Sequence, residues 1–348
     1  MTAATETPVS RTRANQGGRM KDLVSKKRRF ILSGLSIAAL ASMQKPAMAQ
    51  RGTWPDHPIK LVVPVAPGGV ADAIARRFAK NMAEQLGQQI VVENRPGAST
   101  IIGTLAVAKA PPDGYTILLA QTSHIQNPIH FKKIAYDPLK DFTPLGRIGL
   151  SATVVVVRPD LGVKNVDEFV KAARGKRWSY GAGSTGPQVI LEIFNKENDL
   201  GMTGALYKGE TPALTDLLGG QIEMGLFSVF AAKSYLLSGK LTPIAVIGEK
   251  RVASLPNVPT FAEQGHNEMS YGGGWYAFLA PANVAPEIAG RLSMAIKAVL
   301  DNPVERKYLE EMDVIINWTN GNSFAPQMKR DMDAWREMVN RSKVVIDQ

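Results

Sequence analysis

Glycine-rich loops that lead from a strand pattern into a helix pattern are the most evident candidates for chemistry in this chain. Residues 59–63 form a short apolar run typical of a strand, and an amphipathic helical pattern covers residues 70–86. The prolines and glycines between them leave free N–H groups and the positive end of a helix dipole at one spot, which suits an anion. The residues predicted to face that anion are Pro67, Gly68, Gly69 and Val70.

Asp72 brings a carboxylate into the first turn of this predicted helix. With Gly69 as the N-cap, Asp72 is the third helical residue, where its carboxylate can accept a hydrogen bond from the N–H group of the cap residue. A carboxylate at that position also interacts favourably with the helix dipole. We therefore favour a structural role for Asp72 and keep ligand binding as its second interpretation.

A second loop, residues 181–186, matches G-x-G-x-x-G between a strand pattern and a helix pattern. The dinucleotide fingerprint also needs an acidic residue about 20 positions further on, at the end of the next strand, to hold the ribose. The next strand ends instead at Tyr207 and Lys208. A nucleotide site is therefore disfavoured, and we expect no cofactor.

The same loop contains Ala182-x-Ser184-x-Gly186, a relative of the nucleophile elbow of hydrolases. A hydrolase would need an acid and then a histidine further along the chain, for which Asp216 and His266 are the candidates. Because the motif is inexact and His266 lies in a polar segment, a serine hydrolase using Ser184 is the alternative hypothesis, and we do not expect an enzyme. The third interpretation is an anion-facing turn at a helix N-terminus, formed by Gly183, Ser184, Thr185 and Gly186.

Polar residues also follow other strand patterns. A strand at 116–120 ends in a polar loop that contains Thr122, Ser123 and His124, and Lys208 stands at another strand end. Ligands of open α/β sheets lie outside the carboxyl ends of the strands, so these residues are candidates for a binding cleft. The alternatives to ligand contact are that His124 packs within the loop and that Lys208 is simply solvated.

Metal and thiol chemistry find no support in the sequence. The chain has no cysteine, which excludes disulfides, thiol catalysis and thiolate metal sites. Its four histidines show no H-E-x-x-H or comparable spacing, so we predict no metal site. They are His57, His124, His130 and His266.

Residues 1–49 have the pattern of a secretory signal peptide. Basic residues at 26–29 precede an apolar run at 30–41, and Ala47-Met48-Ala49 supplies a small-x-small cleavage site. The apolar run is shorter than the roughly 20 residues that a spanning helix needs. We predict cleavage after Ala49 and export to the periplasm by the Sec or the Tat route, and Met20 is a second candidate for the true start.

The leader also explains most of the net charge. Nine of the 41 Lys and Arg residues and two of the 31 Asp and Glu residues lie within residues 1–49, which leaves 32 and 29, a net charge of +3 instead of +10. The mature part therefore gives no electrostatic reason to expect nucleic acid or an anionic membrane surface as a partner.

Strand and helix patterns alternate along the remaining chain, which predicts an α/β fold with largely parallel sheets. One helix is expected over residues 99–110. Another is expected to begin with Thr211 as its N-cap and Pro212 as its first residue. The length after the leader is ample for one or two domains.

Several short motifs follow one another in order along residues 66–260. They are Ala66-Pro67-Gly68-Gly69 with Asp72, residues 91–98 (VVENRPGA), residues 112–116 (PDGYT), residues 136–142 (YDPLKDF), Tyr207-Lys208-Gly209, residues 212–220 (PALTDLLGG), residues 238–241 (SGKL) and residues 255–260 (LPNVPT). In this order and spacing they resemble the tripartite tricarboxylate transporter substrate-binding receptors, also called Bug-type receptors. The match extends over nearly the whole chain after the leader.

This resemblance implies a type II periplasmic binding protein, in which two α/β lobes are joined by two crossing strands and close like a Venus flytrap on a ligand in the cleft between them. The strand patterns at 152–157 and 242–247 are the expected crossings. Lobe one is then residues 50–155 with 249–348, and lobe two is residues 156–248. Such a pair of crossing strands is a natural hinge.

The resemblance also implies a function and partners. The protein is expected to bind a small organic carboxylate and to hand it to the membrane subunits of a transporter. Presentation of the ligand to a sensor protein fits the sequence equally well. We expect a monomer.

The residues after the strand that ends in lobe two bear on the kind of ligand. Many of the receptors that the chain resembles carry an Asp-Ser pair there, whereas this chain has Phe227 and Ser228, with Phe230 shortly after. If Phe227 faces the cleft, lobe two offers apolar surface instead of a counter-charge for an ammonium group. The resulting hypothesis is an aromatic or otherwise apolar-bodied mono- or dicarboxylate, in preference to an amino acid such as aspartate. The alternative is that Phe227 packs inside the lobe.

Overall fold

The computed structural model describes residues 54–248, 250–269 and 273–342. All of them belong to one compact unit of the chain, which begins at Thr53. The predicted leader and its cleavage site therefore lie outside the described residues. Within the described residues, no helix combines the length and the apolar character needed to cross a membrane.

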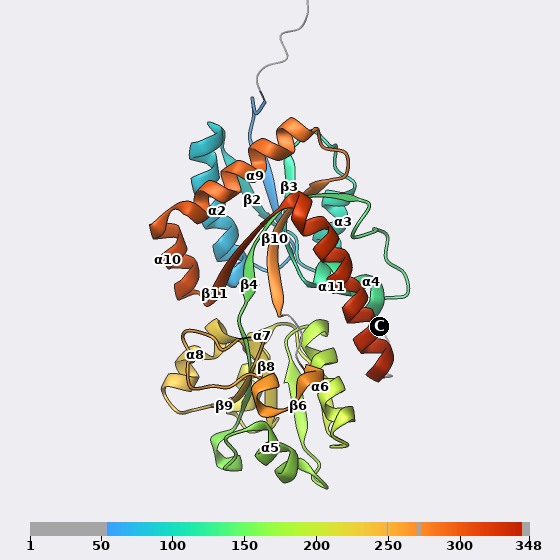
Figure 1. Ribbon diagram of the computed structural model, residues 1–348, viewed down its shortest axis with the longest axis vertical. Coiled ribbons are helices and arrows are strands. Elements are labelled where there is room, and N and C mark those ends of the chain that lie inside the picture. The colour runs from blue at the N-terminus through green and yellow to red at the C-terminus, as the bar shows by residue number, and fades with distance from the viewer. Residues whose placement is uncertain (1–53, 249, 270–272, 343–348) are drawn as a thin grey trace, which may run out of the picture. The chain divides into compact units, whose positions relative to one another are not determined.

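Two separate sheets organise the described chain (Figure 1). The first has the order β11-β4-β10-β3-β1-β2 and the second has the order β7-β6-β8-β5-β9. The strands of the first sheet are β1 (Ile59–Val63), β2 (Ile90–Asn94), β3 (Thr116–Gln121), β4 (Phe142–Ser151), β10 (Gly274–Pro281) and β11 (Val314–Asn320). Those of the second are β5 (Thr153–Val157), β6 (Ser179–Ala182), β7 (Thr203–Leu206), β8 (Met224–Ser228) and β9 (Thr242–Ile247).

Helices follow most of the strands. With the first sheet go α2 (Val70–Leu86), α3 (Ile101–Ala108), α4 (Ser123–His130), α9 (Pro286–Asp301), α10 (Pro303–Glu311) and α11 (Gly321–Ser342). With the second go α5 (Val166–Ala173), α6 (Thr185–Glu197), α7 (Glu210–Leu218) and α8 (Val229–Leu237). Short 3₁₀ turns occupy Pro159–Leu161, Ala262–Gln264 and Asn267–Met269.

Both sheets are mixed, whereas the sequence predicts largely parallel ones. Strands β1, β2 and β3 are parallel, as are β6, β7 and β8. Strand β10 runs antiparallel to β3 and β4, and β5 runs antiparallel to β8 and β9. Of the antiparallel strands, β5 and β10 follow the two passages of the chain between the sheets, β4 into β5 and β9 into β10. Strand β11 runs antiparallel to β4 at the edge of the first sheet. In the parallel half of each sheet the carboxyl ends of the strands still meet at one edge.

Each sheet buries both faces, which explains its apolar runs. In β1, Ile59, Leu61 and Val63 pack with α2 and α9, while Val62 packs on the other face with α3 and α4 residues. In β5, Val155 and Val157 belong to one core cluster, and Val154 and Val156 belong to the other. Successive side chains of each strand thus point to opposite faces of the sheet, and helices cover both faces.

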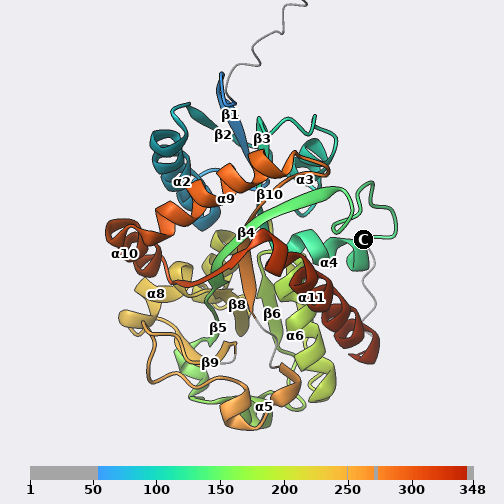
Figure 2. The same cartoon turned by 45° about the horizontal axis from the view of Figure 1, so that its top comes forward.

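The C-terminal helix α11 packs against helices of both sheets. It lies against α4 and also against α6, and Figures 1 and 2 both show it alongside these two helices. Its Trp335 is fully buried in the core cluster that contains Phe194 of α6. The Nε1–H group of Trp335 donates a hydrogen bond to Nε2 of His130 on α4, at 2.8 Å. The hydrogen bond joins α11 to α4, and the packing of Trp335 joins α11 to α6 of the second sheet.

Candidate functional site

The glycine loop between β1 and α2 has the form that the sequence predicts. Gly68 has a φ angle of +93°, and Gly69 is the N-cap of α2 in an extended conformation. Pro67, Gly68 and Gly69 are exposed, and Val70 is partly exposed. Because Gly69 has no side chain, it cannot cap the first turn of α2, and the N–H groups there are available to an anion.

Asp72 shapes this loop. Its Oδ2 accepts hydrogen bonds from the N–H group of Gly68 and from Nε of Arg76, each at 3.0 Å, and its Oδ1 accepts one from Nδ2 of Asn94 at 2.9 Å. The residue is 5% exposed. Burial raises the pKa of Asp72, but the hydrogen bonds from Arg76, Gly68 and Asn94 outweigh burial and hold the pKa below its ordinary value. The sequence predicts a hydrogen bond from the N–H group of the cap residue Gly69, and the structure shows one from Gly68 instead. These contacts still support a structural role for Asp72.

The segment after β3 is a helix start and not the polar loop that the sequence predicts. Thr122 is the N-cap of α4, which begins at Ser123. The Oγ1 atom of Thr122 accepts a hydrogen bond from the N–H group of Trp275 at 2.6 Å, so Thr122 joins β3 to β10. Ser123 is partly exposed, and its Oγ lies 3.0 Å from Oγ1 of Thr100.

His124 lies in the core, at 1% exposure. Its Nε2–H group donates to the carbonyl oxygen of Pro138 at 3.0 Å, and its ring packs edge-on against Phe142, with 4.6 Å between centroids. Burial lowers the pKa of His124 to about 4, so the ring is neutral at physiological pH. The expectation of a cleft-facing histidine is corrected here, because α4 turns this side chain inward against aromatic residues.

The loop before α6 is the counterpart, in the second sheet, of the glycine loop before α2. Ser184 is the N-cap of α6 and is exposed, and Gly183 is partly exposed. Thr185 and Gly186 are buried. A Cβ atom on Gly186 would lie 2.7 Å from Oε1 of Gln126 on α4, so glycine permits this close approach.

One hydrogen bond joins the two sheets at this place. The Oγ atom of Ser99, in the turn before α3, lies 3.2 Å from Oγ1 of Thr185 at the start of α6. The Nδ2–H group of Asn127 donates to the carbonyl oxygen of Ser99 at 2.7 Å. Polar groups that follow β2 and β3 of the first sheet therefore meet one that follows β6 of the second.

The turn that carries Ser99 differs from the prediction of a helix over residues 99–110. Ala98, Ser99 and Thr100 have φ angles of 46°, 49° and 80°, and α3 begins at Ile101. Three consecutive non-glycine residues in the left-handed region are uncommon and store strain, which is found mostly at functional sites. Sequence reasoning missed this turn, because Ala, Ser and Thr give no signal for positive φ.

The contacts around Ser184 do not assemble a serine hydrolase triad. Nε2 of His266 lies 3.1 Å from Oδ1 of Asp167, and Asp216 accepts a hydrogen bond from the hydroxyl of Tyr207 at 2.7 Å. The proposed histidine and acid thus interact with other residues.

The other predicted residues of the second sheet have different environments. Lys208 is exposed in the loop after β7. Ser228 is the N-cap of α8, and its Oγ accepts a hydrogen bond from the N–H group of Ala231 at 3.3 Å. Phe227 is 1% exposed and packs in the core cluster between β5 and α7. The hypothesis that Phe227 faces a ligand is therefore corrected, since its ring lies against Gly225 inside the sheet packing.

Two further residues at this edge were not identified from the sequence. Glu210 begins α7, and its carboxylate accepts hydrogen bonds from Ser228. Tyr276 on β10 of the first sheet is nearly buried, and burial together with the negative charge of Glu210 raises its pKa to about 12. Glu210 could have been identified from the sequence by its position directly after the strand-end motif Tyr207-Lys208-Gly209.

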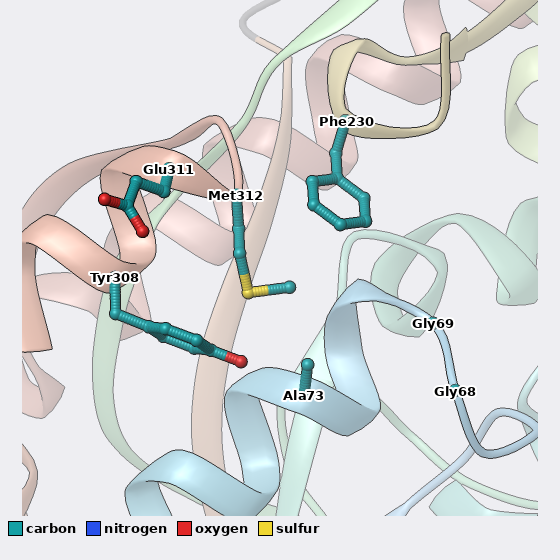
Figure 3. A pocket seen from close by; sticks show the side chains of 7 residues that line it. All are labelled: Gly68, Gly69, Ala73, Phe230, Tyr308, Glu311 and Met312. Carbon is teal, nitrogen blue, oxygen red and sulfur yellow. The ribbon is translucent and has the colours of Figure 1, made fainter. Parts of the chain in front are cut away.

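A pocket of about 270 Å³ lies beside the glycine loop (Figure 3). Gly68, Gly69 and Ala73 line it from α2 and its loop, and helix α8 contributes Phe230, which is 44% exposed. The other lining residues are Tyr308, Glu311 and Met312. Figure 3 shows Phe230, Met312 and Tyr308 around the space next to α2, so the pocket combines helix-start amides with apolar side chains. Within the described residues, no group of three or more His, Cys, Asp or Glu side chains could hold a metal ion.

Comparisons with known proteins identify relatives over most of the chain. Residues 74–348 match the family described as Tripartite tricarboxylate transporter family receptor. Protein BugT of Bordetella pertussis is 33% identical over 273 residues, which cover 76% of this chain and 82% of BugT. The structure of periplasmic binding protein BugD has a TM-score of 0.75 and 29% identity, and covers 84% of this chain and 99% of its own. The structure of R. palustris Rpa4515 with adipate has a TM-score of 0.77 and 28% identity, and covers 84% of this chain and 99% of its own.

Proposed function

The chain belongs to the tripartite tricarboxylate transporter receptor family, and from this premise we propose that it captures a small organic carboxylate and delivers it to the membrane subunits of a tripartite transporter. The α/β fold of a two-lobed periplasmic binding protein, predicted from the sequence, is confirmed by the structural neighbours. The family and these neighbours are receptors and not enzymes.

The observation that carries the proposal is an uncapped helix start in each sheet, together with a hydrogen bond between the sheets at one of them. Gly69 at α2 lacks a capping side chain, and Ser184 at α6 makes no side-chain cap hydrogen bond. The bond between Ser99 and Thr185 joins the turn before α3 in the first sheet to the start of α6 in the second. A helix terminus contributes about 0.3–1 kcal/mol and a charged hydrogen bond about 1.5–3 kcal/mol, so several N–H groups can hold a carboxylate without an ion pair.

The body of the ligand is proposed to be apolar, as an aromatic or aliphatic mono- or dicarboxylate would provide. Since Phe227 is buried, this part of the proposal now rests on Phe230, Tyr308 and Met312, which line the pocket beside Gly68 and Gly69. The carboxylate would meet the loop, and the apolar body would cover the exposed ring of Phe230. The adipate in the Rpa4515 structure is an acid of this kind.

A thermal-shift screen against mono-, di- and tricarboxylates tests the proposal. A ligand present at 100 times its dissociation constant adds about 2.7 kcal/mol to the free energy of unfolding, which shifts the melting temperature by several degrees. Sugars and uncharged amides of matched size serve as controls. If every carboxylate leaves the melting temperature where the controls leave it, the proposed function is wrong.

Ligand is also proposed to act by closing the two lobes about the passages between β4 and β5 and between β9 and β10. A ligand that contacts both lobes favours the closed state by its differential affinity. Small-angle scattering should therefore show a smaller radius of gyration at saturating ligand. An unchanged radius would contradict lobe closure.

Export completes the proposal, because receptors of this family are periplasmic. The mature protein should begin at Gln50, after the Ala47-Met48-Ala49 site. N-terminal sequencing of the protein from a periplasmic fraction checks this. A leader retained in the membrane fraction would contradict it.

A further inference from the structure

Glu210 places a carboxylate at the carboxyl edge of the second sheet, where α7 and α8 both begin. Its Oε1 accepts a hydrogen bond from the N–H group of Ser228, and its Oε2 accepts one from the hydroxyl of Ser228, each at 2.7 Å. Ser228 thereby fixes the orientation of the carboxylate. The carboxylate itself is enclosed, whereas the residue as a whole is partly exposed.

Glu210 differs from three other enclosed acids in its lack of a counter-charge. Asp72 faces Arg76 at 3.0 Å, Glu305 faces Arg77 at 2.5 Å and Asp313 faces Lys233 at 3.3 Å. Among the described residues, no ion pair joins Glu210 to a lysine, an arginine or a histidine. Burial raises the pKa of Glu210 above its ordinary value, although the bonds from Ser228 lower it. An enclosed carboxylate without a cation is costly, and a cationic ligand would remove that cost.

The position of Glu210 is next to the surfaces that suit the carboxylate of a ligand. A Cβ atom on Gly183 would lie 2.6 Å from the backbone nitrogen of Glu210, so the loop before α6 lies directly against the start of α7. From the first sheet, Tyr276 on β10 senses the charge of Glu210. Glu210 therefore lies beside the uncapped start of α6.

We propose that Glu210 determines the ligand class of this receptor: its carboxylate pairs with an ammonium group, so the preferred ligand is an amino carboxylate. The carboxylate of that ligand binds the helix-start amides, and its ammonium group reaches Glu210. This inference rests on the proposed receptor function, and it narrows the proposed ligands to an amino carboxylate with an apolar body in place of a dicarboxylate. It replaces the expectation that lobe two lacks a counter-charge for an ammonium, which was based on Phe227 alone.

A dicarboxylate would meet Glu210 less favourably. Its second carboxylate would stand against a carboxylate already present, and two neighbouring acids of like charge cannot both ionise without a penalty. An ammonium at the same distance gains a charge-assisted hydrogen bond to an oxygen that Ser228 already orients.

Calorimetry with matched acids tests the inference on the mature protein. Each pair has the same number of chain atoms, with an ammonium in place of the second carboxyl group: succinate with β-alanine, glutarate with γ-aminobutyrate, and adipate with δ-aminovalerate. In at least one pair the amino acid should bind about tenfold more tightly than the dicarboxylate. In Glu210→Gln that amino acid should bind about 10- to 100-fold more weakly, so that its advantage is lost.

Glu223→Gln is the matched control. Glu223 precedes β8, accepts a hydrogen bond from the N–H group of Ser179 at 2.7 Å and is paired with Arg158, so it lies at the opposite end of the strand that leads to Ser228. This variant should leave the preference within every pair unchanged. Loss of the preference in Glu223→Gln as well would count against a specific role of Glu210.

Different outcomes separate this inference from the proposed function. Tighter binding of the dicarboxylate in all three pairs would overturn the assignment of Glu210 and leave the receptor function standing. An amino-acid preference that persists in Glu210→Gln would also overturn it. Failure of every carboxylate in the thermal screen would overturn the receptor function, and this inference with it. The preference of the unaltered protein decides the matter if Glu210→Gln does not fold.

Discussion

Asp72 and Glu210 are two carboxylates in the first turns of helices at the site, and their surroundings are opposite. Asp72 has Arg76 beside it, and its pKa lies below the ordinary value. Glu210 has only the neutral donors of Ser228, and its pKa lies above the ordinary value. A carboxylate in the first turn of a helix therefore stabilises the glycine loop in the first sheet. In the second sheet, a carboxylate at the same kind of position has no counter-charge among the described residues.

Removal of the Asp72 carboxylate should have the largest effect on stability. Asp72→Ala leaves Asn94 and the N–H group of Gly68 without their acceptor, and we expect the free energy of unfolding to fall by about 2–4 kcal/mol. Urea unfolding of both proteins measures it. Asp333→Ala on the exposed side of α11 is the control and should unfold like the unaltered protein. An equal effect of the two substitutions would remove the structural role of Asp72.

Ser228→Ala should have an intermediate effect. It removes the hydroxyl that donates to Glu210 and that caps α8 through Ala231, and we expect a loss of about 1–2 kcal/mol at neutral pH. The pKa of Glu210 should rise further, since its ionised form loses a donor. Thermal unfolding at two pH values measures both effects. A loss that is the same at acidic and neutral pH would show that Ser228 acts through the cap alone.

The smallest expected effect is that of Glu210→Gln, and its sign follows from the pKa shift. Because the folded-state pKa of Glu210 is raised above 4.5, folding becomes less favourable as the pH rises from that value through the raised one. The charge of Glu210 also affects Tyr276, but burial raises the pKa of Tyr276 to about 12, so Tyr276 does not titrate in this range. The glutamine variant should lack this decrease and be about 0.5–1 kcal/mol more stable at pH 7. A variant that is less stable at pH 7 would contradict an unpaired charge.

The pH dependence of Asp72 has the opposite sign. Its folded-state pKa is lowered, so its contribution to stability is present above the unfolded-state pKa and is lost as the pH falls through the folded value. Acid unfolding of Asp72→Asn should therefore begin at a higher pH than that of the unaltered protein. Coincident acid transitions would contradict the pairing of Asp72 with Arg76.

The sequence predicted the backbone of the glycine loop but not the direction of several side chains. Strand Ile59–Val63 and helix Val70–Leu86 have the predicted bounds, because glycine, proline and a strong helical period mark them. Phe227 and His124 stand at element ends, where the pattern does not say which face is the core. The structure places both of them inside.

The features that sequence reasoning missed depend on contacts between distant segments. The left-handed turn at Ala98–Thr100 carries no glycine after Gly97, so local preference favoured a helix there. Glu210 was hidden for another reason, since the sequence predicted Thr211 as the N-cap of α7 whereas Gly209 is the cap. Glu210 stands out because its carboxylate is hydrogen-bonded to Ser228, 18 residues away, and is not paired with a cationic side chain in the described part of the chain. Neither feature can be read from the local sequence.

Carbon-13 NMR titration of the Asp72 and Glu210 side-chain carboxyl groups, with and without δ-aminovalerate, tests the central comparison most directly. We expect a low pKa for Asp72 that the ligand leaves unchanged, and a raised pKa for Glu210 that falls when the ammonium group binds beside it. A Glu210 pKa that is at its ordinary value in the free protein, or that stays unchanged in the complex, would contradict a carboxylate without a counter-charge that pairs with the ligand.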